Sequence, residues 1–121
     1  MSKILFTAIL FVFSLSVLSQ EKMPKVAREF RGMWIATVAN LDFPSKQNLT
    51  ADQQKAELIK LLDLATELRM NAVIFQIRSM GDAVYYSDIE PASPFITGQM
   101  GENLPFDPLK FLLDEAHARG I

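Results

Sequence analysis

The sequence has no cysteine among its 121 residues. Disulfides are therefore excluded, hydrophobic packing must stabilise the fold, and no thiol is present for lipid attachment. Basic residues are not in excess either, because 12 lysines and arginines stand against 14 acidic residues, for a formal net charge of −2. Such a chain lacks the basic surface that nucleic-acid binding requires, so we expect no nucleic-acid partner.

Motifs for several common chemistries are missing as well. The sequence contains a single histidine, His117, and has no cluster of metal-ligating residues, no Gly-x-Ser-x-Gly motif and no P-loop. We therefore expect no metal site, no other cofactor, no serine triad and no phosphoryl transfer. His117 falls within an expected helix, and we expect it to face solvent.

Apolar residues form a long run near the beginning of the chain. Met1 to Ser19 combines an early lysine, an apolar stretch from Ile4 to Leu18 and small residues at its end, which is the layout of a secretory signal peptide. The stretch is shorter than the roughly 20 apolar residues that a spanning helix needs. We predict cleavage after Ser19, no membrane span afterwards, and export to the periplasm or the cell exterior, with residues 20–29 as a linker. An uncleaved membrane anchor is the alternative.

Two strands are expected in residues 30–121. Aromatic and β-branched side chains predict the first over Phe30–Asn40, and a nearly unbroken apolar stretch predicts the second over Ala72–Arg78. Residues 79–106 contain several prolines and are expected to form a long loop, and loops of that length are usually functional or hide a further element.

Two helices are expected, each with a clear start. Thr50 followed by Gln53 matches a capping box, and Asp107 followed by Pro108 places a capping side chain before a proline in the first turn. Gly120 is expected to end the second helix. The apolar stripes consist of Leu58, Leu61, Leu62, Ala65 and Leu68 in the first helix, and Leu109, Leu112, Leu113 and Ala116 in the second.

The order strand, helix, strand, helix is typical of α/β folds with a parallel sheet. Two parallel strands leave both sheet edges open, so we expect these residues to be the front part of a larger domain. The expected strands begin near Met33, Ala72 and Ile121, a spacing at which eight units take about 350 residues, within the range of (β/α)8 barrels. We therefore predict a TIM barrel of which this chain holds about the first two βα units. A doubly wound sheet is the competing architecture, but the first strand is not followed by a glycine-rich phosphate turn.

Alternation along the second strand separates its side chains into two faces. One face carries Val73, Phe75 and Ile77, and the other carries Ala72, Ile74, Gln76 and Arg78. The wholly apolar set suits a helix layer, so Gln76 and Arg78 are expected to point into the barrel at the carboxyl end of the strand, where barrel enzymes assemble their sites. A structural ion pair is an equally weighted alternative for Arg78.

Side chains of the following loop extend this candidate site. The Asp82 carboxylate could bind sugar hydroxyls, pair with Arg78 or cap its own turn, and the last is the commonest role of an aspartate in a turn. Tyr85 and Tyr86 could stack on a sugar ring or pack the loop onto the barrel. Trp34, in the first strand, has the same ambiguity, and we expect it to pack in the core. The expected ligand-binding residues are Gln76, Arg78, Asp82 and Tyr85.

Three stretches of the sequence resemble a known family. They are EFRGMWIATVANLDFPS from Glu29, NAVIFQIRSMGDAVYYSDIEPASPFITGQMG from Asn71, and FDPLKFLLDEAHARGI from Phe106. Together they resemble the amino-terminal portion of the glycosyl hydrolase-like 10 family of exported bacterial proteins. The Gln-x-Arg-x-x-Gly-Asp-Ala core that starts at Gln76 is fairly specific to that family.

The resemblance implies a barrel that hydrolyses glycosidic bonds in a bacterial cell-wall or related polysaccharide. It also implies that the catalytic carboxylates lie on a later strand, beyond residue 121. Glycoside hydrolysis usually needs two carboxylates, and of the acidic residues here only Asp82 is suitably placed. The catalytic acid and base are thus not identified, and residues 30–121 alone are expected to be inactive. A non-catalytic glycan-binding barrel and an inactive gene fragment are the alternatives.

Overall fold

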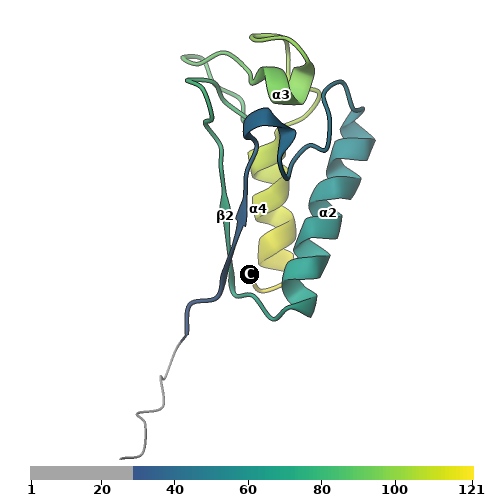
Figure 1. Cartoon of the computed structure of the whole chain (residues 1–121), viewed down its shortest axis with the longest axis vertical. Helices are drawn as coiled ribbons and strands as arrows, with labels where there is room; N and C mark the ends of the chain where they lie inside the picture. The colour runs from purple at the N-terminus through teal and green to yellow at the C-terminus, as the bar shows by residue number, and fades with distance from the viewer. Residues whose placement is uncertain (1–28) are drawn as a thin grey trace, which may run out of the picture.

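The computed structural model describes residues 29–121, in which helices pack on one side of a two-stranded sheet (Figure 1). The elements are β1 (Gly32–Ile35), the 3-10 helix η2 (Val38–Asn40), α2 (Ala51–Glu67), β2 (Ala72–Phe75), α3 (Pro94–Thr97) and α4 (Pro108–Ala118). The expected signal peptide lies outside the described residues. Within residues 29–121, every helix is too short or too polar to cross a membrane.

The two strands are parallel neighbours joined through a helix. Gly32 lies opposite Ala72 and Ile35 lies opposite Phe75. The connecting helix α2 packs beside α4 on the same side of the sheet (Figure 1). The fold is therefore a partial α/β domain with a parallel sheet, as the order of elements in the sequence predicts.

Both strands are shorter than predicted. β1 ends at Ile35 and not at Asn40, and β2 also stops before its predicted end. The apolar pattern continues past Ile35, but the backbone changes its partners, because the Ala36 N–H donates to the Asp42 carboxylate at 2.8 Å. Ala39 and Asn40 then adopt positive φ angles of 54° and 53°. These conformations turn the chain into η2 and end the ladder of strand hydrogen bonds.

The predicted helix starts are confirmed. Thr50 Oγ1 accepts the Gln53 N–H at 3.3 Å while Gln53 Oε1 accepts the Thr50 N–H at 3.0 Å, which completes a capping box at α2. Asp107 caps α4 by accepting the Lys110 N–H at 2.9 Å. His117 is exposed in α4, as expected. Of the predicted stripes, Leu58, Leu62, Ala65, Leu112 and Ala116 are buried, whereas Leu68 and Leu113 are about half exposed.

The core lies between the helices and one face of the sheet. Its buried members are Ile35, Phe43, Leu58, Val84, Ile96, Phe106 and Leu112. Val73, Phe75 and Ile77 pack against this cluster, which confirms that the wholly apolar set of the second strand faces the helices. Gln76 and Arg78 therefore belong to the other face. Trp34 and Ile74, which pair across the two strands, lie on that face as well.

The sheet face opposite the helices is open within residues 29–121. Trp34 is 59% exposed and Ile74 is 40% exposed, and these two residues are paired across the strands. The expectation that Trp34 packs in the core is therefore wrong for the described part of the chain. Its alternation places it away from the helices, where no described residue covers it.

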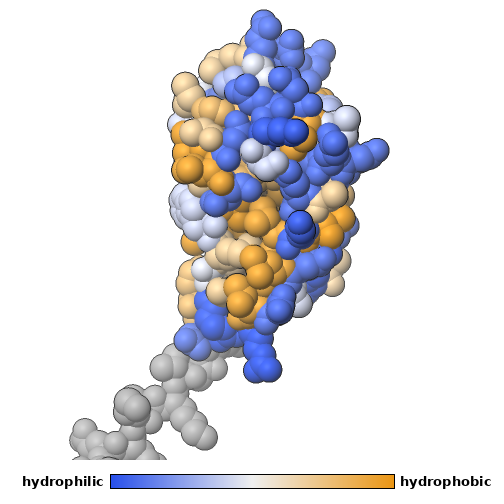
Figure 2. All heavy atoms as spheres, turned by 45° about the vertical axis from the view of Figure 1, so that its right-hand side comes forward, coloured by the Kyte–Doolittle hydropathy of each residue, from blue (hydrophilic) through white to orange (hydrophobic). Residues whose placement is uncertain are grey.

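Apolar side chains also reach the surface on the helix side, where Figure 2 shows hydrophobic patches between hydrophilic residues. A groove of about 590 Å³ runs along α2 and the loop that precedes it, and it is lined by Leu61 and Leu64 together with charged side chains such as Glu57 and Lys60. Like the open sheet face, this flank of α2 is uncovered among residues 29–121.

Candidate functional site

The loops after β1 and β2 lie together at the carboxyl ends of the two strands, at the top of Figure 1. Asn40 ties them to each other, because its Nδ2 donates to the carbonyl of Pro44 at 2.8 Å and to that of Phe95 at 2.9 Å. Within the second loop, a parallel bridge joins Ala83 to Ala92. The predicted long loop is thus ordered by its own contacts, and it contains the short helix α3, which the sequence did not predict.

Gln76 follows β2 directly, and only one half of its side-chain amide is hydrogen-bonded within the described residues. Oε1 accepts the N–H groups of Thr37 at 3.0 Å and Val38 at 3.1 Å. Thr37 Oγ1 in turn donates to the Gln76 carbonyl at 2.8 Å. Within residues 29–121 the Nε2 group donates no hydrogen bond. The carbonyl half therefore fixes the amide plane, and the NH2 half retains two donors for a ligand.

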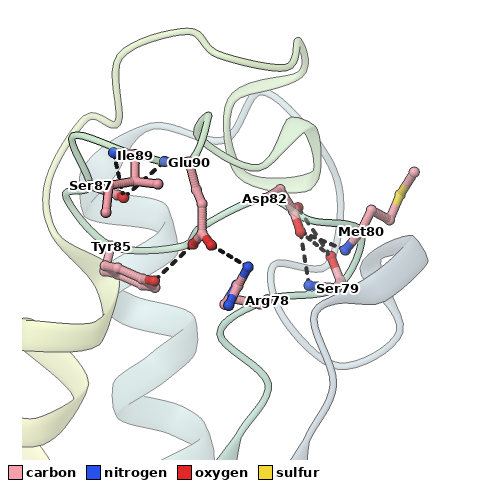
Figure 3. Close-up of polar contacts among 8 residues, drawn as sticks. All are labelled: Arg78, Ser79, Met80, Asp82, Tyr85, Ser87, Ile89 and Glu90. Atoms are coloured by element: carbon pink, nitrogen blue, oxygen red, sulfur yellow. Dashed lines mark hydrogen bonds and ion pairs between the residues drawn. The ribbon is translucent and has the colours of Figure 1, made fainter.

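Arg78 and Tyr85 both bind the carboxylate of Glu90 (Figure 3). The Arg78 guanidinium forms an ion pair with Glu90 Oε1 through Nη2, and Tyr85 Oη donates to Glu90 Oε2 at 3.0 Å. The ion pair considered as an alternative role for Arg78 is therefore present. The Arg78 side chain nevertheless remains 53% exposed, whereas that of Glu90 is 18% exposed. A guanidinium held on one side by a half-buried carboxylate can still bind a ligand with its other N–H groups.

The contact with Glu90 also affects the Tyr85 phenol. The hydrogen bond to the Glu90 carboxylate raises the pKa of Tyr85 above the ordinary value of 10.0, because it favours the protonated phenol. Tyr85 is half-buried and Tyr86 is 64% exposed, and both line a cavity of about 170 Å³ together with Glu90 and Asn103. Aromatic faces beside polar groups suit the mixed apolar and polar surface of a sugar ring.

A Ser-x-x-Glu turn places Glu90. Ser87 Oγ accepts the N–H of Ile89 at 3.2 Å and that of Glu90 at 3.1 Å (Figure 3). The sequence analysis missed Glu90 as a member of the site. The signal that could have found it is the spacing of Ser87 and Glu90, which matches a capping box in a stretch that does not continue as a helix.

Asp82 is 0% exposed and caps its own turn. Its Oδ1 accepts the N–H groups of Ser79 at 2.8 Å and Met80 at 2.6 Å, and Ser79 Oγ donates to both carboxylate oxygens at 3.1 Å (Figure 3). Burial alone would raise the pKa of Asp82, but hydrogen bonds with Ser93, Met80 and Ser79 outweigh it and hold the pKa below the ordinary 3.8. Asp82 therefore supports the loop that carries Tyr85 and has no exposed surface of its own.

Two glycines in these loops offer a matched pair of substitutions. Gly98 and Gly81 both have positive φ, at 92° and 73°. A Cβ on Gly98 would lie 2.8 Å from Asn48 Cγ, whereas a Cβ on Gly81 would meet nothing within 4 Å. We expect Gly81→Ala to lower the free energy of unfolding by about 1 kcal/mol through backbone strain alone, and Gly98→Ala to lower it by about twice as much. Urea unfolding of both variants measures the difference, and equal losses would show that Asn48 moves aside without cost.

Comparisons with known proteins identify the family. The family model described as Glycosyl hydrolase-like 10 matches residues 29–121. The chain belongs to this family. The resemblance of the three sequence stretches to it is thereby confirmed, and the match covers every residue of the site described above.

Within the same residues no group of three metal-ligating side chains lies close enough to hold an ion.

Two curated relatives are named as glycosyl hydrolases. The chain is 47% identical over 94 residues to Glycosyl hydrolase YngK of Bacillus subtilis (strain 168), which covers 78% of this chain and 18% of that protein. It is 42% identical over 102 residues to Glycosyl hydrolase DigH of Escherichia coli (strain K12), which covers 78% of this chain and 23% of that protein. The chain therefore spans roughly a fifth of the length of these relatives.

Proposed function

We propose that the complete protein is a glycoside hydrolase that acts on a bacterial cell-wall or related polysaccharide. The observation that carries the proposal is the pair of donor groups at the end of β2, the Gln76 amide and the Arg78 guanidinium. Each is held in place by a partner within the fold, and each retains N–H groups for a ligand. Donors in this arrangement suit an oxygen-rich ligand such as a sugar with hydroxyl, N-acetyl or carboxylate groups. The curated relatives, both described as glycosyl hydrolases, support the same class.

We also propose that the residues of this chain are the first two βα units of a TIM barrel. Two uncovered surfaces support this architecture. Trp34 and Ile74 are exposed on the sheet face that would line the barrel interior, and Leu64 is exposed in the groove beside α2, where a neighbouring helix would pack. Further parallel strands would cover the first surface, and further helices would cover the second.

In this proposal the catalytic carboxylates come from residues outside this chain. Glycoside hydrolysis uses two carboxyl groups that flank the scissile bond. At the strand ends described here, Asp82 is buried within its turn and Glu90 is paired with Arg78 and Tyr85. Both carboxylates are therefore engaged in holding the site together, so the described residues supply part of a sugar-binding wall.

The donor groups of Gln76 and Arg78 also fit a second candidate, a barrel that binds glycan without cleaving it. Release of reducing sugar from purified bacterial peptidoglycan by the complete protein distinguishes the two candidates. The hydrolase proposal predicts release that increases with time and protein concentration. Binding of peptidoglycan without release would favour the binding-only barrel, and absence of binding would contradict both.

Replacement of Gln76 by glutamate tests the donor role of its amide. The carboxylate retains an oxygen to accept the Thr37 and Val38 N–H groups but loses both N–H donors and adds negative charge. We expect Gln76→Glu to weaken binding to peptidoglycan by about tenfold or more, with the free energy of unfolding within about 1 kcal/mol of the wild type. Sedimentation binding and urea unfolding measure the two quantities.

The control is Gln76→Leu, which removes the acceptor as well as the donors. We expect this variant to lose about 1–3 kcal/mol of stability, because two half-buried backbone N–H groups lose their acceptor. If Gln76→Glu binds glycan as the wild type does, the NH2 group does not contact the ligand and Gln76 serves only to join the two loops.

A further inference from the structure

We infer that Glu90 is a positioning residue of the glycan site, which holds the Arg78 guanidinium and the Tyr85 ring as one unit. This inference rests on the proposed function, because it concerns how the same wall recognises sugar. Glu90 lies fourteen positions after Gln76 in the chain, beyond the family core motif, so the sequence pattern alone does not connect it with the site.

The geometry gives each oxygen of Glu90 a separate partner. Oε1 faces Arg78, and Oε2 accepts the hydrogen bond from Tyr85 at 3.0 Å. Figure 3 shows the carboxylate between the two side chains, with Arg78 and Tyr85 approaching it from different segments of the loop. A carboxylate that binds two groups at once fixes the distance and angle between them.

The base of the Glu90 side chain is fixed as well. Its backbone N–H is bound by Ser87 Oγ at 3.1 Å, and its side chain is largely buried at 18% exposure. Arg78 is 53% exposed, so the guanidinium is the member of the pair that faces solvent. Glu90 therefore limits the rotamers of a side chain that would otherwise lose considerable entropy on binding a ligand.

Glu90 also lines the cavity beside Tyr85 and Tyr86, but its carboxylate is already engaged by partners within the fold. Both of its oxygens are occupied within the fold, and its exposed fraction is about a third of that of Arg78. We therefore expect it to affect glycan binding through Arg78 and Tyr85 and not by direct contact. This distinction makes the inference testable, because an indirect effect disappears when both intermediaries are removed.

The test measures binding of the complete protein to purified peptidoglycan. We expect Glu90→Gln to weaken binding by about 3- to 10-fold, since the guanidinium remains but loses its ionic partner. In a protein that already carries Arg78→Ala and Tyr85→Phe, the same substitution is expected to change binding by less than about twofold. An equal effect in both backgrounds would mean that Glu90 contacts the glycan directly, and this result would overturn the inference.

A matched control and a spectroscopic measurement complete the test. Glu115→Gln removes a carboxylate that pairs with Arg119 at 2.7 Å in α4, remote from the loops, and should leave glycan binding unchanged. Ultraviolet titration of the phenols should show that the pKa of one tyrosine falls towards 10.0 in Glu90→Gln. If the wild type binds peptidoglycan and Glu90→Gln binds it equally well, the inference is wrong while the proposed function stands. If the wild type does not bind, the proposed function fails and the inference fails with it.

Discussion

Replacement of Arg78 by alanine in the complete protein is expected to weaken glycan binding by about 10- to 100-fold, because a charged hydrogen bond to a ligand contributes about 1.5–3 kcal/mol. The free energy of unfolding should fall by less than about 1 kcal/mol, because the Arg78 side chain is 53% exposed and exposed ion pairs contribute little to stability. Sedimentation with purified peptidoglycan and urea unfolding measure the two effects on the same preparation.

Arg119 provides the control for this experiment. It pairs with Asp63 at 2.9 Å and with Glu115 at 2.7 Å, and it lies at the end of α4 away from the candidate site. We expect Arg119→Ala to reduce stability without changing glycan binding. If Arg78→Ala instead unfolds the protein while any folded remainder binds glycan normally, Arg78 is only a structural partner of Glu90 and its place in the site is wrong.

Loss of the Asp82 carboxylate is expected to have the largest effect on stability. Asp82→Ala leaves the N–H groups of Ser79 and Met80 without the buried carboxylate that accepts both of them. We expect the free energy of unfolding to fall by about 1.5–3 kcal/mol, the range for hydrogen bonds to a charged group. Chemical unfolding at neutral pH measures this loss, and a loss below about 0.5 kcal/mol would show that the turn recruits another acceptor.

The same carboxylate makes stability depend on pH. The pKa of Asp82 is below 3.8 in the folded protein, so the unfolded chain takes up a proton at a higher pH than the folded chain does. The stabilisation is therefore fully present above the unfolded pKa of about 3.9 and is lost as the pH falls through the lower folded pKa. Unfolding measured between about pH 6 and about pH 2 should show the gap between wild type and Asp82→Asn narrowing in acid. A constant gap would mean that Asp82 titrates equally in both states.

The sequence predicts the two long helices, α2 and α4, well because their starts are local events. Thr50 with Gln53, and Asp107 with Pro108, determine the first turn through contacts within a few residues. The predicted strands are too long because the ends of a strand depend on partners that are distant in the sequence. Beyond the end of β1, the Ala36 N–H donates to the Asp42 carboxylate and not to a neighbouring strand. The periodicity of apolar residues cannot predict that contact.

The candidate site also combines features that local sequence patterns predict with features that depend on distant contacts. Alternation along the second strand correctly separated Gln76 and Arg78 from the residues that face the helices. The pairing of Arg78 with Glu90 was not predictable from alternation, because the loop must fold back before Glu90 comes within reach. The exposure of Trp34 was likewise missed, since a strand pattern shows which residues share a face but not whether another element covers that face.

In the Gln76 amide, the oxygen binds the loop after β1 and the NH2 group has no partner among the described residues. This combination limits which residues evolution or engineering can substitute for Gln76. Glutamate retains the acceptor but not the donors, lysine and arginine retain donors but not the acceptor, and asparagine has both groups on a side chain shorter by one methylene. Each of these substitutions thus gives up the join between the loops, the donors of the NH2 group, or the reach to one of them. A half-buried residue outside the core is in this way constrained by the backbone of a neighbouring loop.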